Sequence, residues 1–299
     1  MQTGNHKLQI SKKEKVLFPK SGITKNDIVL YYDAMADHIL PFLKNRPLTM
    51  QRFPHGIGQQ GFFQKNASEY FPDWIQTVKV KKVDGWLNQV VCNTKETLIY
   101  LVNQYTLTFH VALSTVNSIN KPDKMIFDLD PPKGDFQLAV DGAKTIRQLL
   151  EEKLKLKTYI MTSGSKGLHV AVPLKCHENF DEVRQFARQI SEYIADKNPE
   201  KYTTAIRKNQ RKSRLYIDFL RNSYMQTSVS PFSIRAIMGA PVATPLQWTE
   251  LNQRGMSAQT YTMHNIFKRL EQVENPWRDF NKNAKSILSA KKRLLELVN

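Results

Sequence analysis

The sequence predicts an α/β fold of two packed lobes, in which mixed sheets are flanked by helices. Two observations predict it. Short apolar runs typical of strands alternate with longer segments whose apolar residues recur at helical spacing, and this alternation is most regular after Met125. The 299 residues are 41% hydrophobic, which is enough for a sizeable core. We therefore expect a single catalytic domain, residues 1–299, with one lobe to about residue 120 and another from about 121.

The first lobe is expected to begin with a helix and continue with strands. Thr24 is placed to cap a helix that runs to about Leu43, with Asp27 in its first turn and apolar residues at helical spacing behind it. Alternating segments predict the strands that follow. These strands cover residues 48–53, 78–83, 87–93 and 97–101.

The second lobe is expected to alternate strands and helices. Asn179 and Glu182 have the spacing of a capping box before a helix at 180–197. A second helix is predicted at 136–153, and a basic amphipathic helix from about Lys282. The predicted strands cover residues 125–129, 158–161, 168–172 and 214–220.

The charge of the chain favours a polyanionic partner. Its 44 Lys and Arg outnumber 27 Asp and Glu, giving a net charge of +17 and an isoelectric point near 9.7. Such a balance suits nucleic acid, because each neutralised phosphate releases condensed counterions. The two cysteines lack metal-ligand spacing and indicate a reducing compartment. Without a long apolar run or a signal peptide, a cytoplasmic, nucleoid-associated protein with no membrane partner is expected.

Three carboxylates carry most of the functional information. Asp128 and Asp130 lie two apart after Met-Ile-Phe, so on a strand they point to the same face, and Asp218 follows Leu-Tyr-Ile. An isolated Asp-x-Asp is more often a solvated turn at the end of a strand. Here both apolar flanks indicate buried strands, in which an unpaired carboxylate is costly. Oxygen ligands of this kind suit Mg²⁺ or Mn²⁺, so we expect a pair of ions here.

A small-residue turn lies between these strands. Ser163-Gly-Ser-Lys-Gly-Leu-His169 combines two glycines, which permit close backbone approach, with a hydroxyl, an amine and an imidazole. Alone it is as often a hairpin turn as a phosphate site. The basic run 207–214 leads into the Asp218 strand, as a path for a triphosphate or a primer would require. Together with the carboxylates, these segments favour nucleotidyl transfer on a nucleic acid.

Several segments, in this order, resemble the archaeo-eukaryotic primase superfamily, and most of all the polymerase domain of bacterial ATP-dependent DNA ligase D. They are Lys12-Lys-Glu-Lys-Val-Leu-Phe-Pro, Gly22-Ile-Thr-Lys25, Arg46-Pro-Leu, Gly61-Phe-Phe-Gln-Lys65, Phe-Asp128-Leu-Asp130-Pro, the turn Ser163–His169, Ile-Asp218-Phe-Leu-Arg-Asn222, Gly239-Ala-Pro-Val-Ala-Thr-Pro-Leu and Asn275-Pro-Trp. The resemblance covers nearly the whole chain.

The resemblance implies a metal-dependent, template-directed polymerase that fills gaps and extends ends during non-homologous end joining. It implies metal ligation by Asp128, Asp130 and Asp218, contact with an incoming NTP or dNTP by Ser163, Lys166, His169, His110 and Arg235, grip on a DNA 5′-phosphate by Lys12, Lys15 and Lys25, and template contact by Arg52, Phe62 and Phe63. We expect one of the two phenylalanines to lie in the core. Ku and a ligase, as a domain or a separate protein, are implied partners.

Two other functions remain open at this level. Lys82-Val-Asp-Gly85 matches the Lys-x-Asp-Gly signature of covalent nucleotidyltransferases such as DNA ligases, although an Asp-Gly turn between two strands explains it as well. A non-catalytic module that bridges DNA ends would also be basic. Such a module would not need three aspartates on hydrophobic strands.

Overall fold

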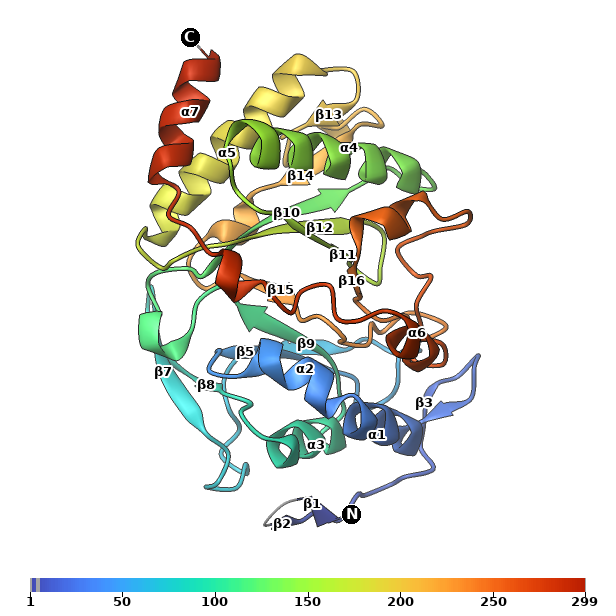
Figure 1. Ribbon diagram of the computed structural model, residues 1–299. Coiled ribbons are helices and arrows are strands. Elements are labelled where there is room, and N and C mark those ends of the chain that lie inside the picture. Colours follow the sequence, from blue (N-terminus) through green and yellow to red (C-terminus); the bar gives the residue numbers. More distant parts are fainter. Residues whose placement is uncertain (1, 4–5, 299) are drawn as a thin grey trace. The chain divides into compact units, whose positions relative to one another are not determined.

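The computed structural model describes residues 2–3 and 6–298, which form two compact units (Figure 1). The first consists of Met1–Asn117, Thr227–Ala243 and Tyr261–Phe267. The second consists of Ser118–Gln226, Thr244–Thr260 and Lys268–Asn299. The chain thus returns twice to the first unit after entering the second, which a single boundary near residue 120 does not describe.

The first unit is built on an antiparallel sheet with strand order β15-β9-β5-β6. Tyr32 fixes its helical layer to this sheet, because its buried hydroxyl donates to the Leu107 carbonyl at 2.6 Å. The elements are β1 (Gln2–Thr3), β2 (His6–Lys7), β3 (Val16–Phe18), β4 (Ile23–Thr24), α1 (Lys25–Ala34), α2 (Ala36–Leu43), β5 (Leu48–Arg52), β6 (Phe62–Gln64), β7 (Thr77–Lys82), β8 (Gly85–Val90), α3 (Lys95–Asn103), β9 (Thr106–Ala112) and β15 (Thr227–Val229).

Two expectations for this unit need correction. The predicted strand at 97–101 is wrong: the segment lies in α3, where Thr94 accepts a hydrogen bond from the Thr97 backbone and caps the helix. The cap and burial of the apolar side chains outweigh the β-propensity of the segment. The single helix predicted from Thr24 is two helices that meet at Met35. Its start is confirmed, since Thr24 and Asp27 form a capping box.

The second unit is built on a six-stranded mixed sheet with strand order β13-β14-β10-β12-β11-β16. Its neighbouring strands are antiparallel except β13 and β14. The elements of the rest of the chain are β10 (Lys124–Asp130), α4 (Phe136–Gln148), β11 (Tyr159–Thr162), β12 (Leu168–Pro173), α5 (Phe180–Lys197), β13 (Tyr202–Thr203), β14 (Leu215–Asp218), β16 (Pro245–Leu246), α6 (Ile266–Gln272) and α7 (Leu288–Val298). Short helical turns are η1 (Val116–Ser118), η2 (Leu149–Lys153), η3 (Lys208–Gln210), η4 (Leu220–Asn222), η5 (Trp248–Asn252) and η6 (Asn281–Asn283).

Helices α4 and α5 cover one face of this sheet (Figure 1). Gly142 of α4 makes room for Leu215 of β14, since a Cβ on Gly142 would lie 2.3 Å from the Leu215 Cδ2. Leu215 therefore points towards α4. Because side chains alternate along a strand, Tyr216 and Asp218 point to the opposite face.

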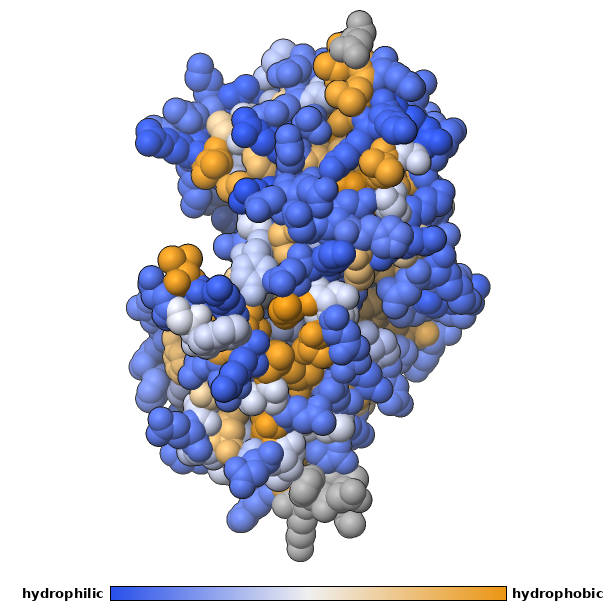
Figure 2. Space-filling view, turned by 90° about the vertical axis from the view of Figure 1, so that its left-hand side faces the viewer, coloured by the Kyte–Doolittle hydropathy of each residue, from blue (hydrophilic) through white to orange (hydrophobic). Residues whose placement is uncertain are grey.

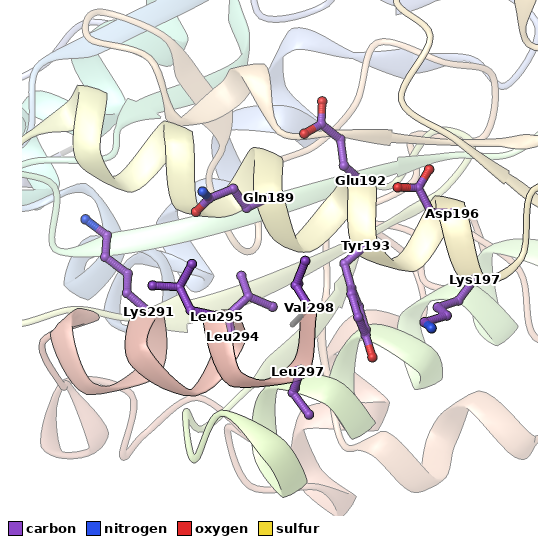
Figure 3. Close-up of a pocket in the computed structure, with 10 residues that line it drawn as sticks. All are labelled: Gln189, Glu192, Tyr193, Asp196, Lys197, Lys291, Leu294, Leu295, Leu297 and Val298. Carbon is purple, nitrogen blue, oxygen red and sulfur yellow. The ribbon is translucent and has the colours of Figure 1, made fainter.

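The predictions for the helices of this unit are largely confirmed. Helix α5 has the predicted bounds, and Asn179 and Glu182 form the expected capping box. The predicted C-terminal helix begins later than expected, at Leu288, because residues 281–283 form a separate short turn. Helices α5 and α7 border a groove of about 400 Å³ that carries apolar side chains from α7 (Figure 3).

The surface is predominantly hydrophilic on the face shown in Figure 2, with hydrophobic residues in separate patches. Among the described residues, no helix combines the length and apolar character that crossing a membrane requires.

Asn222 is expected to be a major stabilising residue, because its buried side chain bonds both backbone groups of Ile126 on β10, accepting at 2.8 Å and donating at 2.7 Å. Asn222→Ala leaves these groups unsatisfied and should lower the free energy of unfolding by about 3 kcal/mol. Urea unfolding followed by circular dichroism measures this. The matched change at exposed Asn252 should cost less than about 1 kcal/mol. Equal losses in both variants would contradict the assigned role.

Candidate active site

Asp128 lies at the centre of a row of polar side chains that crosses the second unit's sheet. It is the register partner of Asp218 on β14 and of His169 on β12. Directly opposed residues on antiparallel strands project to the same face, so backbone pairing alone aligns these three side chains. Asp130 projects to this face as well, two residues further along β10. The predicted convergence of the three aspartates on one face of a sheet is therefore present.

Two basic side chains flank Asp128. The His169 Nε2 lies 3.2 Å from its Oδ1, and the Arg221 Nε donates to its Oδ2 at 3.1 Å. Burial by itself raises the pKa of Asp128, but the attraction of His169 and Arg221 prevails and lowers it to about 2. Asp128 is thus a carboxylate throughout the neutral range.

The other two aspartates have the opposite shift. Burial, and then the negative charge of Asp128, raise the pKa of both Asp130 and Asp218. Asp218 still accepts a hydrogen bond from the Leu220 backbone at 2.8 Å, and Arg211 lies 4.0 Å from Asp130. The three carboxylates therefore repel one another, and further positive charge would stabilise their ionised forms.

The cluster has hard oxygen donors but not the geometry of a preformed ion site. Within the described part of the chain, no three His, Cys, Asp or Glu side chains are arranged as a group that could hold a metal ion. Arg221 lies between two of the donors, with its Nε 3.5 Å from the Asp218 Oδ2. The donor chemistry fits Mg²⁺ or Mn²⁺, and ligation requires these side chains to rearrange.

The Ser163–His169 turn closes against β10. The Ser163 hydroxyl accepts hydrogen bonds from the backbones of Ser165 and Gly167, each at 3.2 Å. A Cβ on Gly167 would lie 1.7 Å from the Leu129 carbonyl oxygen, so only glycine fits there. Ser163 and His169 are buried, whereas Lys166 is exposed. A phosphate would therefore meet Lys166 first.

A cavity lies where β10 and this turn meet. Its volume is about 390 Å³, and its lining includes the segment from Pro131 to Phe136, Ser165 with Lys166, and the segment from Ser257 to Gln259. Lys133 and Lys166 supply amines to this lining. The cavity is thus next to the end of the Asp128–Asp130 strand and contains groups that attract phosphate.

Three predicted phosphate-binding lysines lie close together in the first unit. The Lys25 side chain is fully buried, and its Nζ donates to the Ser11 carbonyl at 2.7 Å. The Nζ atoms of Lys25 and Lys15 lie 4.4 and 5.4 Å from the centre of the Tyr105 ring. Burial, and then the charges of Lys12 and Lys15, lower the pKa of Lys25 to about 8. Lys12 and Lys15 are the more accessible amines.

The two phenylalanines of the predicted template site are both exposed, 46% for Phe62 and 60% for Phe63. The expectation that one lies in the core is wrong, because β6 is a short edge strand. Phe63 stands edge-on to His110, with ring centres 5.5 Å apart. Arg52, by contrast, is buried and donates to Gln104, Gln64 and Tyr70. Template contact by these residues stays a prediction.

The predicted nucleotide contacts are divided between the two units. His110, on β9, and Arg235 belong to the first unit, and the Ser163–His169 turn belongs to the second. Their joint contact with one nucleotide stays a prediction.

Lys82 lies in a β-hairpin, as the interpretation of Lys-x-Asp-Gly as a turn between two strands predicts. It pairs with Gly85 across the two-residue turn Val83–Asp84 that joins β7 and β8. Gly85 has a φ of +112°, a conformation that favours glycine. Lys82 is exposed at the end of this hairpin. The hairpin thus accounts for the Lys-x-Asp-Gly match without a covalent nucleotidyltransferase site.

No role for Arg221 follows from the sequence, although it lies in the segment Ile-Asp218-Phe-Leu-Arg-Asn222 that carries part of the family resemblance. Arg221 lies three residues after Asp218, and a short helical turn brings residues at this spacing together. This spacing is the feature of the sequence that indicates contact between Arg221 and Asp218. Nothing in the sequence alone indicated its contact with Asp128, which depends on strand pairing.

Comparisons with known proteins agree with this architecture. A family model described as the LigD primase-polymerase domain matches residues 24–277. The bifunctional non-homologous end joining protein LigD of Bacillus subtilis is 36% identical over 279 residues, covering 93% of this chain and 44% of the relative. The multifunctional LigD of Pseudomonas aeruginosa is 29% identical over 291 residues, covering 96% and 34%.

A solved structure has the same fold. The polymerase domain of Mycobacterium tuberculosis ligase D, in complex with DNA, matches with a TM-score of 0.86 and 25% identity, covering 93% of this chain and 99% of that chain. This chain spans less than half the length of the two relatives named above. The expected fold and the resemblance drawn from the motifs are confirmed, and the chain belongs to the family of LigD primase-polymerase domains.

Proposed function

We propose that the protein is a metal-dependent, template-directed nucleotidyltransferase that extends a DNA 3′-hydroxyl at gaps and broken ends during non-homologous end joining. The observation that carries this proposal is the alignment of Asp128 with Asp218 across paired strands, with Asp130 on the same face, in a chain of the LigD primase-polymerase family. The names of the relatives support the end-joining context, and the DNA complex of the mycobacterial domain supports DNA as substrate.

Asp128, Asp130 and Asp218 are the proposed ligands of Mg²⁺ or Mn²⁺. When bound, such ions lower the pKa of an attacking hydroxyl and neutralise charge on a departing pyrophosphate. The protein's own contribution is positioning: β10 and β14 fix the backbone of two carboxylates opposite each other, and His169 holds one oxygen of Asp128. A non-catalytic DNA-bridging module would not need this arrangement.

The triphosphate of an incoming NTP or dNTP is proposed to bind at the Ser163–His169 turn. Two observations support this: Lys166 is exposed at the turn, and the adjoining cavity of about 390 Å³ is also lined by Lys133. His110 and Arg235 are proposed to complete nucleotide contact. Ribonucleotide preference, and cooperation with Ku and a ligase, belong to the same proposal through family membership.

The Lys12–Lys15–Lys25 cluster is the proposed site for a DNA 5′-phosphate. The charges of Lys12 and Lys15 repel that of Lys25, and a bound anion would relieve this repulsion. Phe62 and Phe63 are proposed to stack on template bases, since both are exposed and base stacking tolerates any sequence.

Asp128→Asn is expected to reduce primer extension on a gapped duplex by at least about 100-fold, because a neutral amide is a poor ligand for a hard cation. DNA affinity, measured by fluorescence anisotropy, should change less than about threefold. Asp141→Asn, on α4, removes the same charge outside the cluster and serves as the control. Retained synthesis in Asp128→Asn would refute catalysis at this cluster and would favour the bridging module.

The preference for a 5′-phosphorylated end should fall as the pH rises from 7 to 9. Lys25 has a pKa of about 8 in the free protein, and a nearby phosphate dianion favours its charged form. Above pH 8, binding of the phosphorylated end must therefore include protonation of Lys25. The preference is the dissociation constant for an end without phosphate divided by that for an end with phosphate. This ratio should drop about tenfold between pH 7 and pH 9. Anisotropy at constant ionic strength measures this ratio.

Lys25→Met should make that ratio independent of pH in this range, whereas the exposed control Lys20→Met should keep the wild-type pH dependence. An unchanged ratio from pH 7 to pH 9 in the wild type would exclude Lys25 from the phosphate site.

Phe63→Ala should weaken binding to a gapped template by about 2 kcal/mol, the typical contribution of one stacked base. The slope of affinity against salt should stay unchanged, because no phosphate contact is lost. Leu30→Ala, at a similarly exposed apolar residue on α1, is the control. A smaller slope with unchanged affinity at low salt would argue against stacking.

A further inference from the structure

Arg221 occupies the space between two carboxylates that the proposed function assigns to metal. Its Nε donates to the Asp128 Oδ2 at 3.1 Å and lies 3.5 Å from the Asp218 Oδ2. These two aspartates are register partners on β10 and β14. One guanidinium therefore binds two like charges that backbone pairing forces to face each other, and it offsets their repulsion.

The backbone around Arg221 is fixed, while its side chain has room to move. Asp218 accepts from the Leu220 backbone, and buried Asn222 bonds to Ile126 on β10, so both neighbours of Arg221 are anchored. The Arg221 side chain, however, is 40% exposed, against 12% for Asp128 and 13% for Asp218. The guanidinium can leave the carboxylates without displacing the turn that carries it.

The other basic side chains at the cluster do not share this position. His169 contacts the opposite oxygen of Asp128, at 3.2 Å. Arg211 lies 4.0 Å from Asp130 and is stacked over the Tyr216 ring at 3.8 Å. Arg221 is therefore the cation that bridges Asp128 and Asp218, and it engages the Asp128 oxygen that His169 leaves available.

We infer that Arg221 is a resident counter-cation, which holds Asp128 and Asp218 together when no metal is bound and is displaced when a divalent ion enters. The inference rests on the proposed metal site and adds a competition at that site. Arg221 then stabilises the metal-free protein and lowers its affinity for the ion. A purely structural arginine that positions the ligands would have the opposite effect, since its loss would weaken metal binding.

The test compares the wild type with Arg221→Gln and Arg221→Lys, using Mn²⁺ alone as the probe. In EDTA, Arg221→Gln should melt at a lower temperature, because the two carboxylates lose their shared partner. Titration calorimetry should show Mn²⁺ binding about tenfold tighter or more, since a positive charge has been removed from the site. Addition of Mn²⁺ should raise the melting temperature of Arg221→Gln more than it raises that of the wild type. Arg221→Lys keeps the charge and should bind Mn²⁺ within about threefold of the wild type.

Arg188→Gln is the matched control, because it removes one arginine charge from α5 outside the cluster. Its Mn²⁺ affinity should equal that of the wild type. Weaker or unchanged Mn²⁺ binding in Arg221→Gln would overturn the inference. Failure of the metal site itself is distinguishable: in that case the wild type would bind Mn²⁺ no better than Asp128→Asn does.

Discussion

The antiparallel pairing of β10 with β12 and β14 is the constraint on which the candidate site depends. It places Asp128 directly between His169 and Asp218, so that two carboxylates face each other on one side of a sheet. Such an arrangement costs free energy unless positive charge is nearby. Arg221, and in the proposed function a divalent ion, supply that charge. Asn222 anchors the segment that carries Arg221 through its two hydrogen bonds with the backbone of Ile126.

Two glycines of the second unit determine how neighbouring elements pack against the strands that carry the carboxylates. Gly142 admits Leu215 against α4, and alternation along β14 then directs Asp218 to the other side of the sheet. Gly167 lets the Ser163–His169 turn approach the carbonyl of Leu129 at the end of β10. In each case a missing side chain brings two elements close enough to define the site.

The first unit carries the proposed DNA-binding residues rather than the carboxylate cluster. Lys15 and Lys25 share the Tyr105 ring, and Lys25 is buried with a lowered pKa, so that a nearby anion would favour the charged form of Lys25. Phe62 and Phe63 are exposed because β6 is an edge strand. Arg52 is buried and joins β5 to neighbouring segments through hydrogen bonds to Gln104, Gln64 and Tyr70.

The sequence by itself determined the fold class, most elements of the second unit and the shared face of Asp128 and Asp130, because strand alternation and helix caps are local properties. It misassigned 97–101, where capping and burial outweighed β-propensity. Only the tertiary structure decided that Asp218 and His169 flank Asp128, that Arg221 bridges two carboxylates and that Lys25 is buried. The contacts of Asp128 with His169, Asp218 and Arg221 join residues far apart in the chain, and the pairing of β10 with β12 and β14 brings these residues together.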